Sequence, residues 1–416
     1  MHEPGLLHHL IAERYTPESL HLIRGVLEQH KSHQIPSGAH GLFAASPSQS
    51  RESITGYQNV WIRDNVMVAN SFRLRGELAR ATACMQGLTQ FLAREVPRFR
   101  EIIDDPSKAL KEDTHRRPHI RFRARTLEEL PEKWPHAQND ALGHALWFRF
   151  VLANSGAMPL TAPDAEIFRL FPDYFAAIEY WQDQDSGAWE EGRKINNSSV
   201  GAVVAGLEEM RKCSQAGVAH EQLDHLIAHG RARLNQTLPF ESPPERMVDA
   251  ALLFLIHPLE VLGDRAVETA IVNLVRARLE GEVGIKRYVG DSYFCQDYDE
   301  WFKAEEISAD FSEHIDFRDA LLRPNCEAQW CIFDPLLSTI YGQRFLTDRS
   351  RIDDFHKQTH YFNRSLAQIT TSGECPELYF LKNGRYIPNA HTPLAWTQAN
   401  QALALRLMEQ SVREMR

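Results

Sequence analysis

The chain lacks long hydrophobic runs, a surplus of basic residues and closely spaced cysteines. Its longest apolar run, from Ala250 to Ile256, is far shorter than the ~20 residues that a membrane-spanning helix needs. The first fifteen residues, MHEPGLLHHLIAERY, turn polar within a few positions and lack the apolar centre of a signal peptide. We therefore expect a cytoplasmic protein that does not bind membranes.

The charge balance is acidic. The chain has 46 lysines and arginines against 56 aspartates and glutamates, a net charge of −10. Proteins that bind nucleic acid need basic surfaces that neutralise phosphates. The sequence therefore predicts no nucleic-acid partner, and no feature of it indicates an oligomeric state.

Metal ligands with recognisable spacing are also missing. The six cysteines form no C-x-x-C pair, which argues against a cysteine zinc site, and a reducing compartment disfavours disulfides. Among the 19 histidines, no His-x-x-x-His pair lies beside a carboxylate in the zinc-protease pattern. We expect no metal and no organic cofactor.

What the sequence does contain is helical periodicity. With 43% hydrophobic and 25% charged residues in 416, the composition is that of a globular protein. Helix-like patterns recur along the chain, and we expect helices near 17–30, 60–80, 81–98, 138–155, 164–182, 196–213, 220–236, 246–258, 264–280, 326–342, 349–366 and 392–413. Twelve segments of similar size predict a closed ring of helical hairpins.

Long polar loops separate these segments and hold most of the tryptophan, tyrosine and carboxylate residues. They span 38–58, 104–137, 183–196, 281–325 and 367–391. Loops of this length inside a compact domain are usually functional. In the second loop, HIRFRAR at 119–125 alternates apolar and basic residues. This pattern predicts a short strand pair, or alternatively an anion-binding patch, which the overall acidity disfavours.

Three stretches place aromatic residues beside carboxylates at borders between helices and loops: YQNVWIRD at 57–64, DSGAWEEG at 185–192 and GECPELY at 373–379. Aromatic rings stack on the apolar faces of sugars, while arginine and aspartate bind their hydroxyl groups. A carboxyl group next to an aromatic ring in a dry cleft favours its protonated form. Taken singly, each stretch also fits a structural role, such as a surface ion pair of Arg63 and Asp64.

Seven stretches in order resemble glycoside hydrolase family fifteen, the glucoamylases, and the related helical domain of phosphorylase kinase regulatory subunits. VWIRDNVMVA at 60–69 is similar to the family's WxRD helix start. GAWEEGRKINNSSVGAVVAGLE at 187–208 is similar to the segment with the catalytic acid, and CPELYFLKNGRYIPNAHTPLAWTQAN at 375–400 to the segment with the base. The other four are WPHAQNDALGHALW (134–147), VDAALLFL (248–255), GIKRYVGDSY (284–293) and CEAQWCIFDPLLSTIYG (326–342).

The resemblance implies an all-α fold in one domain over residues 1–416: an (α/α)6 barrel, or six-hairpin toroid, with long active-site loops at one end. It implies an inverting, exo-acting α-glucosidase that releases β-glucose from the non-reducing ends of soluble α-glucans or oligosaccharides. The catalytic acid then corresponds to Glu190 and the base to Glu377. The substrate-binding positions correspond to Arg63, Asp64, Trp134, Trp189 and Arg287, with Trp61 and Glu191 added by adjacency.

The chemistry of the two glutamates agrees with this assignment. Inversion needs two carboxyl groups about 6.5–9.5 Å apart on opposite faces of the sugar, with a water between one of them and the anomeric carbon. Trp189 supplies the apolar neighbour that favours a protonated Glu190. Two alternatives stay open: a carbohydrate-binding or regulatory module of the phosphorylase kinase type without turnover, and a hydrolase specific for isomaltose or trehalose. Glutamate at both positions favours an enzyme.

Overall fold

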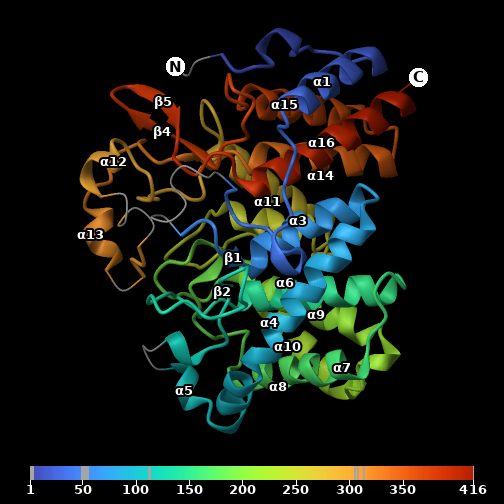
Figure 1. Ribbon diagram of the computed structural model, residues 1–416, viewed down its shortest axis with the longest axis vertical. Helices are drawn as coiled ribbons and strands as arrows, with labels where there is room; N and C mark the ends of the chain where they lie inside the picture. The colour runs from blue at the N-terminus through green and yellow to red at the C-terminus, as the bar shows by residue number, and fades with distance from the viewer. Residues whose placement is uncertain are drawn as a thin grey trace.

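The structure is a computed structural model that describes residues 4–47, 56–110, 114–303, 306, 309–312 and 314–415. It is dominated by α-helices, as the sequence predicted. The long helices run across the view in Figure 1, and the short strands and the small helices α12 (Tyr298–Trp301) and α13 (Ile315–Asp319) gather at their left-hand end. The long loops thus lie together at one end of the helices.

An inner ring of helical segments forms the core. Its members are α3 (Ile62–Leu74), α6 (Asn139–Asn154), α9 (Asn197–Arg211), η6 (Ala250–Leu255), α14 (Phe333–Thr347) and α16 (Ala395–Glu414). In α3, α6, α9 and α14, most residues are buried whichever side of the helix they lie on, as expected for helices inside a domain. Consecutive members contact each other, and α16 returns to α3. Between η6 and α14 the contact is aromatic, with the rings of Phe254 and Phe333 6.2 Å apart.

An outer layer of helices covers this ring. It consists of α1 (Pro17–Gln29), α4 (Leu78–Asp104), α8 (Leu170–Ala177), α10 (His220–Thr237), α11 (Arg265–Leu279) and α15 (Ile352–Ala367). These helices are amphipathic. In α15, for example, Gln358, Tyr361, Phe362 and Leu366 are buried and the opposite side is exposed. Each outer helix packs on the inner ring or on an outer neighbour, so the polar faces point outward.

Four of the expected helices differ in the structure. The segment expected at 60–80 begins as strand β1 (Val60–Trp61), forms α3 only as far as Leu74, and its last residues belong to α4. The segment expected at 246–258 is a short 3-10 helix, η6, that begins where the Asp249 side chain accepts a hydrogen bond from the Ala251 amide. The segment expected at 326–342 starts later because Gln329 and Trp330 form strand β3. The segment expected at 164–182 is divided into α7 (Ala162–Phe168) and α8, since Pro172 lacks the amide hydrogen that would continue the helix.

Short antiparallel strands tie the loops to the helix ends. Strand β1 (Val60–Trp61) pairs with β2 (Arg121–Phe122), and β3 (Gln329–Trp330) pairs with β4 (Leu378–Lys382), which pairs with β5 (Arg385–Pro388). The strand predicted within HIRFRAR is therefore confirmed, and both of its residues, Arg121 and Phe122, are buried. The strands hold the segments that flank Arg63 and Glu377 at the loop end.

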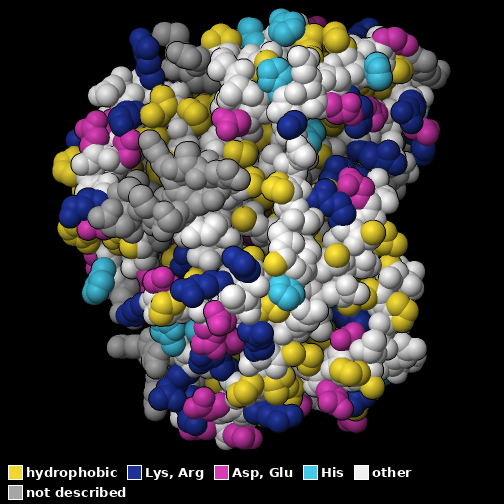
Figure 2. Space-filling view, in the orientation of Figure 1, with side chains coloured by type: hydrophobic (Ala, Val, Ile, Leu, Met, Phe, Trp, Pro, Cys, Tyr) yellow, Lys and Arg dark blue, Asp and Glu magenta, His cyan; other side chains and the backbone are white. Residues whose placement is uncertain are grey.

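The surface and the thiols add little chemistry of their own. On the face shown in Figure 2, lysine and arginine side chains are interspersed with aspartates and glutamates. All six cysteines are free thiols. No helix in the described part of the chain is both long and apolar enough to span a membrane.

Close approach of α6 and α9 depends on glycine. A β-carbon built at Gly143 would lie 2.6 Å from the backbone carbon of Ala202 and the backbone nitrogen of Val203. On the facing helix, a β-carbon at Gly206 would lie 2.9 Å from the carbonyl oxygen of Gly143. Contacts this short cannot be relieved by rotating a side chain, so the inner helices must separate to accept a larger residue.

We therefore expect Gly143→Ala to lower the free energy of unfolding by about 1–3 kcal/mol, the usual cost of overpacking a core. The matched control is Gly25→Ala, on the exposed side of α1, where no atom lies within 4 Å of the added carbon. That control should keep or raise stability by up to about 1 kcal/mol, because alanine favours a helix. Urea unfolding followed by circular dichroism measures the unfolding free energy of both variants. Equal values for Gly143→Ala and Gly25→Ala would contradict the packing argument.

Candidate active site

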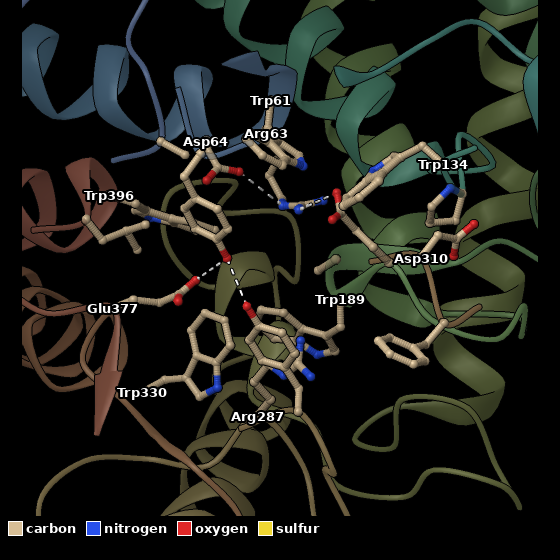
Figure 3. A pocket seen from close by; sticks show the side chains of 18 of the residues that line it. Trp61, Arg63, Asp64, Trp134, Trp189, Arg287, Asp310, Trp330, Glu377 and Trp396 are labelled. Carbon is tan, nitrogen blue, oxygen red and sulfur yellow. Dashed lines mark hydrogen bonds and ion pairs between the residues drawn. The ribbon is translucent and has the colours of Figure 1, made fainter. Parts of the chain in front are cut away.

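A cavity opens at the loop end of the inner ring. Its wall is made by segments distant in sequence, as Figure 3 shows for the labelled residues. Eight of the nine residues that the sequence assigned to the site line this cavity: Trp61, Arg63, Asp64, Trp134, Trp189, Glu190, Arg287 and Glu377. The two candidate catalytic glutamates therefore share one cavity.

Glu190 reaches the cavity through an unusual backbone conformation. It follows the short 3-10 helix η4 (Gly187–Trp189) and has left-handed dihedral angles, φ 60° and ψ 40°. Residues with side chains rarely adopt this region, and such strain concentrates at functional sites. The Gln138 amide donates a hydrogen bond to Glu190 Oε1 at 3.1 Å, and Arg63 Nη2 lies 3.7 Å from the same oxygen. Burial raises the pKa of Glu190, and the Arg63 charge and the Gln138 bond only partly oppose this.

Glu377 has a different environment. It directly precedes strand β4, is 3% exposed and lies among hydrogen-bond donors. The Tyr57 hydroxyl donates to Oε1 at 2.8 Å, while the Asn389 amide and Nδ1 of His391, at 3.0 Å, contact Oε2. Donors around a carboxyl group stabilise its ionised form. The cavity thus holds two glutamates in different surroundings: burial raises the pKa of Glu190, and three hydrogen-bond partners surround the carboxyl group of Glu377.

Arg63 and Asp64 occupy the first turn of α3. Arg63 is 4% exposed and its Nη1 donates to Gln138 Oε1 at 3.0 Å and to Asp140 Oδ2 at 3.1 Å. Arg63 Nε lies 3.8 Å from Asp64 Oδ2, so the two do form an ion pair, but Arg63 is buried and the interpretation as a surface ion pair is wrong. Burial raises the pKa of Asp64 to about 7, against the effect of Arg63, and the charges of Glu190 and Glu377 raise it further. Asp64 therefore lies close enough to both glutamates to feel their charges.

The cavity wall is rich in indole rings. Besides Trp61, Trp134 and Trp189, it includes Trp330 and Trp396. Arg287 lies among these rings, 5.2 Å from the Trp189 ring centre and 5.0 Å from that of Trp330. This mixture of flat apolar faces and fixed polar groups suits a sugar ring, which has both.

Glu191 is the assigned residue that does not line the cavity. Its carboxylate is 2% exposed and accepts hydrogen bonds from Arg246 at 2.9 Å, from Arg287 at 3.0 Å, and from Arg318 and Tyr288. Burial alone would raise the pKa of Glu191, but the three guanidinium charges outweigh it and hold this pKa well below its ordinary value. Glu191 thus holds Arg287 and Arg318, which do line the cavity.

The sequence analysis did not assign several lining residues, including Tyr57, Tyr293, Asp310, Arg318, Trp330 and Trp396. Four of them carried a signal. Tyr57, Tyr293, Trp330 and Trp396 lie within stretches that the analysis had already singled out, so the aromatic content of these stretches could have identified them. Asp310 and Arg318 come from the rest of the 281–325 loop, whose fold the sequence does not reveal.

A second cluster of titratable groups lies outside the cavity, in the 104–137 loop. His115, His119 and His136 have ring nitrogens within 4.8 Å of one another, a grouping that the sequence analysis missed. The His119 and His136 rings stack 3.7 Å apart and nearly parallel. Because ring-nitrogen lone pairs lie in the ring plane, these two rings do not point at a common ion. Burial lowers the pKa of His119 to about 4 and that of His136 well below its ordinary value.

Comparisons with known proteins agree with the fold. A family model described as "Glycosyl hydrolases family 15" matches residues 21–342. A glycosidase structure in complex with glucose aligns with a TM-score of 0.67 at 16% identity, over 96% of this chain and 98% of that chain. The glucoamylase from Saccharomycopsis fibuligera aligns with a TM-score of 0.64 at 12% identity, over 98% of both chains. The expected (α/α)6 barrel is confirmed.

The curated sequences that this chain resembles are named as phosphorylase kinase subunits and not as glycosidases. The phosphorylase b kinase regulatory subunit alpha, liver isoform, of Takifugu rubripes is 24% identical over 358 residues. The match covers 74% of this chain and 27% of that protein, so the chain spans about a quarter of the relative's length. This likeness fits the branch that the motifs resembled.

Removing the charge of Glu191 tests its structural role. Glu191→Gln would leave Arg246, Arg287 and Arg318 buried without their shared counter-ion, and breaking such a group costs about 3–5 kcal/mol of unfolding free energy. The control, Glu374→Gln, changes an exposed glutamate and should stay within about 0.5 kcal/mol of the parent. Denaturant titration compares them, and two equally stable variants would show that Glu191 is not needed to hold the arginines.

Proposed function

The chain belongs to glycosyl hydrolase family 15, and on that premise we propose that it is an inverting, exo-acting α-glucosidase of the glucoamylase type. Its substrates are soluble α-glucans or oligosaccharides, from whose non-reducing ends it releases β-glucose. The observation that carries this proposal is the pair of glutamates with opposed environments in one aromatic cavity. Burial favours the protonated form of Glu190, whereas donors stabilise the ionised form of Glu377.

The reaction follows from these two states. Glu190 gives its proton to the glycosidic oxygen, so that the bond from this oxygen to the anomeric carbon breaks and the leaving sugar departs as an alcohol. A water molecule on the opposite face forms the new bond to the anomeric carbon and gives a proton to Glu377. Attack from the opposite face converts an α-linkage into β-glucose, and proton exchange with solvent restores both glutamates.

The remaining wall residues bind and orient the sugar. Arg63 is fixed by Gln138 and Asp140, so its guanidinium can donate to sugar hydroxyls without first losing side-chain freedom. Asp64 accepts from a hydroxyl on the same side, and Arg287 donates from among the tryptophan rings. A chain end fits such an enclosed site, and this supports exo action.

The likeness to the phosphorylase kinase regulatory subunit supports a second candidate, a regulatory module that binds carbohydrate without turnover. This chain nevertheless has glutamates at both catalytic positions and a cavity that contains both. A hydrolase specific for isomaltose or trehalose is a third candidate, with the same two glutamates and a different linkage. The assay below separates all three.

Purified protein should release glucose from at least one of maltose, maltotriose, isomaltose, trehalose or dextrin. Proton NMR should show β-glucose first, with α-glucose appearing only by mutarotation, because inversion sets the product anomer. Initial α-glucose would refute the inverting assignment. Oligosaccharide binding by calorimetry, without product from any of these sugars, would support the regulatory module.

Glu190→Gln and Glu377→Gln should each lower kcat by roughly 10²–10⁴-fold, the usual contribution of a general acid or base. Both variants should remain folded, since each replaces a carboxyl group by an amide of the same shape, although Glu377→Gln should unfold at a lower temperature because its amide nitrogen cannot accept a hydrogen bond. In the parent, activity should fall on the alkaline side as Glu190 loses its proton, at a pH above the ordinary range of a glutamate because its pKa is raised. Near-parental rates in either variant would refute that residue's role.

A further inference from the structure

We infer that His391 is a positioning residue that, together with Tyr57, fixes the carboxylate of Glu377 so that only Oε1 is open to take a proton from water. The inference rests on the proposed function of Glu377 as the base and names the atom that performs it. Neither the motifs nor the comparisons assign a role to His391.

The hydrogen bonds to Glu377 distinguish its two oxygens. Oε2 accepts from the Asn389 amide and from Nδ1 of His391 at 3.0 Å. Each carboxylate oxygen has about two lone-pair sites, so Oε2 has none left. Among the described residues, Oε1 accepts a hydrogen bond only from the Tyr57 hydroxyl, at 2.8 Å. One acceptor site therefore remains on the whole carboxylate, on Oε1, and Glu377 lines the cavity.

The chemistry of the partners sets the direction of each bond. As the proposed base, Glu377 is ionised and its oxygens can only accept, so in the proposed site His391 carries its proton on Nδ1 in this contact. Burial and the charge of Glu377 raise the pKa of Tyr57 well above its ordinary value, so its hydroxyl keeps the proton that it donates. Because that proton goes to Glu377, the hydroxyl of Tyr293, 3.1 Å away, donates to the Tyr57 oxygen. Figure 3 shows this chain of bonds leading from Glu377.

The two side chains that contact the Glu377 carboxylate, those of Tyr57 and His391, also pack against each other. The rings of Tyr57 and His391 stack with their centres 3.5 Å apart and their planes 12° apart. Phe294 meets the His391 ring edge-on at 5.9 Å, and His391 is 2% exposed. The imidazole thus has little freedom to rotate, and neither has the carboxylate between the two donors. Such fixed donors keep a reacting group in its productive geometry.

The backbone brings His391 to the base. Strand β5 pairs with β4, which directly follows Glu377, and the chain then returns toward the base before α16 begins. The backbone N–H of Asn389 donates to the backbone carbonyl of Leu378 at 3.2 Å. The backbone N–H of Leu394 donates to the backbone carbonyl of Cys375 at 2.9 Å. These two bonds tie the segment that contains His391 to the segment that contains Glu377 at both ends.

Two substitutions separate the hydrogen bond from the ring stack. His391→Phe keeps a ring for Tyr57 to stack on and removes the donor, whereas His391→Asn keeps an amide donor and removes the ring. We expect His391→Phe to lower kcat roughly 10–100-fold, the value of a hydrogen bond to a charged group, and to change KM less than about threefold. The acidic limb of the pH–rate profile should move to higher pH by about one unit, because the ionised base loses a donor.

His391→Asn should return kcat and the acidic limb most of the way to the parent values. His356→Asn, an exposed histidine on α15, is the control and should match the parent throughout. If folded His391→Phe retains both the parent kcat and the parent acidic limb, the positioning role is refuted. If that variant does not fold, His391→Met, which also lacks a donor and fills a similar volume, takes its place.

A direct titration separates failure of this inference from failure of the proposed function. Carbon-13 NMR of glutamate-labelled protein, with the Glu377 signal identified by its loss in Glu377→Gln, reports the pH at which this carboxyl group binds a proton. His391→Phe should shift that pH upward even if the parent cleaves none of the sugars, in which case only the proposed function fails. If the Glu377 titration is the same in His391→Phe as in an active parent, the positioning role of His391 is refuted, while the glucosidase assignment stays in place.

Discussion

Charged side chains can be buried at the loop end of this barrel only where each one meets a partner. Glu191 is the clearest case, since its carboxylate pairs with Arg246, Arg287 and Arg318, while Asp249 and Asp291 supply further negative charge to Arg246 and Arg287. A second pair, Arg117 and Asp183, forms two hydrogen bonds of 2.7 and 2.8 Å and joins the 104–137 loop to the 183–196 loop. These pairs give long loops a defined shape around the cavity.

The same burial creates the difference between the two catalytic candidates. Both glutamates lie at the end of an apolar ring, where water is scarce and a carboxyl group tends to keep its proton. At Glu190, burial outweighs the charge of Arg63 and the hydrogen bond from Gln138, so the pKa of this carboxyl group rises. Glu377 receives bonds from Tyr57, Asn389 and His391, which compensate its charge. In the proposed mechanism, one residue type thus supplies both the acid and the base because the surroundings of Glu190 and Glu377 differ.

The inner ring supports this arrangement by its rigidity. Helices that are buried on all sides, and that approach each other closely through Gly143 and Gly206, cannot shift without breaking many contacts. The segments that begin or end at the cavity, such as the first turn of α3 with Arg63, therefore have fixed positions. Catalytic geometry of the kind proposed needs this precision, because small displacements of an acid or base reduce its contribution strongly.

The sequence by itself determined the helical class and most helix positions, and eight of the nine site residues that it named line the cavity. Periodicity and local motifs carry this information because they are properties of neighbouring residues. It placed Glu191 beside the substrate, where the structure puts it behind Arg287, because adjacency in sequence does not say which way a side chain points. The left-handed backbone of Glu190 likewise has no signature in its residue type. Only the tertiary structure brought Tyr57 and His391 to Glu377. Tyr57 lies 320 residues from Glu377 along the chain, and contacts over such distances depend on how the whole ring closes.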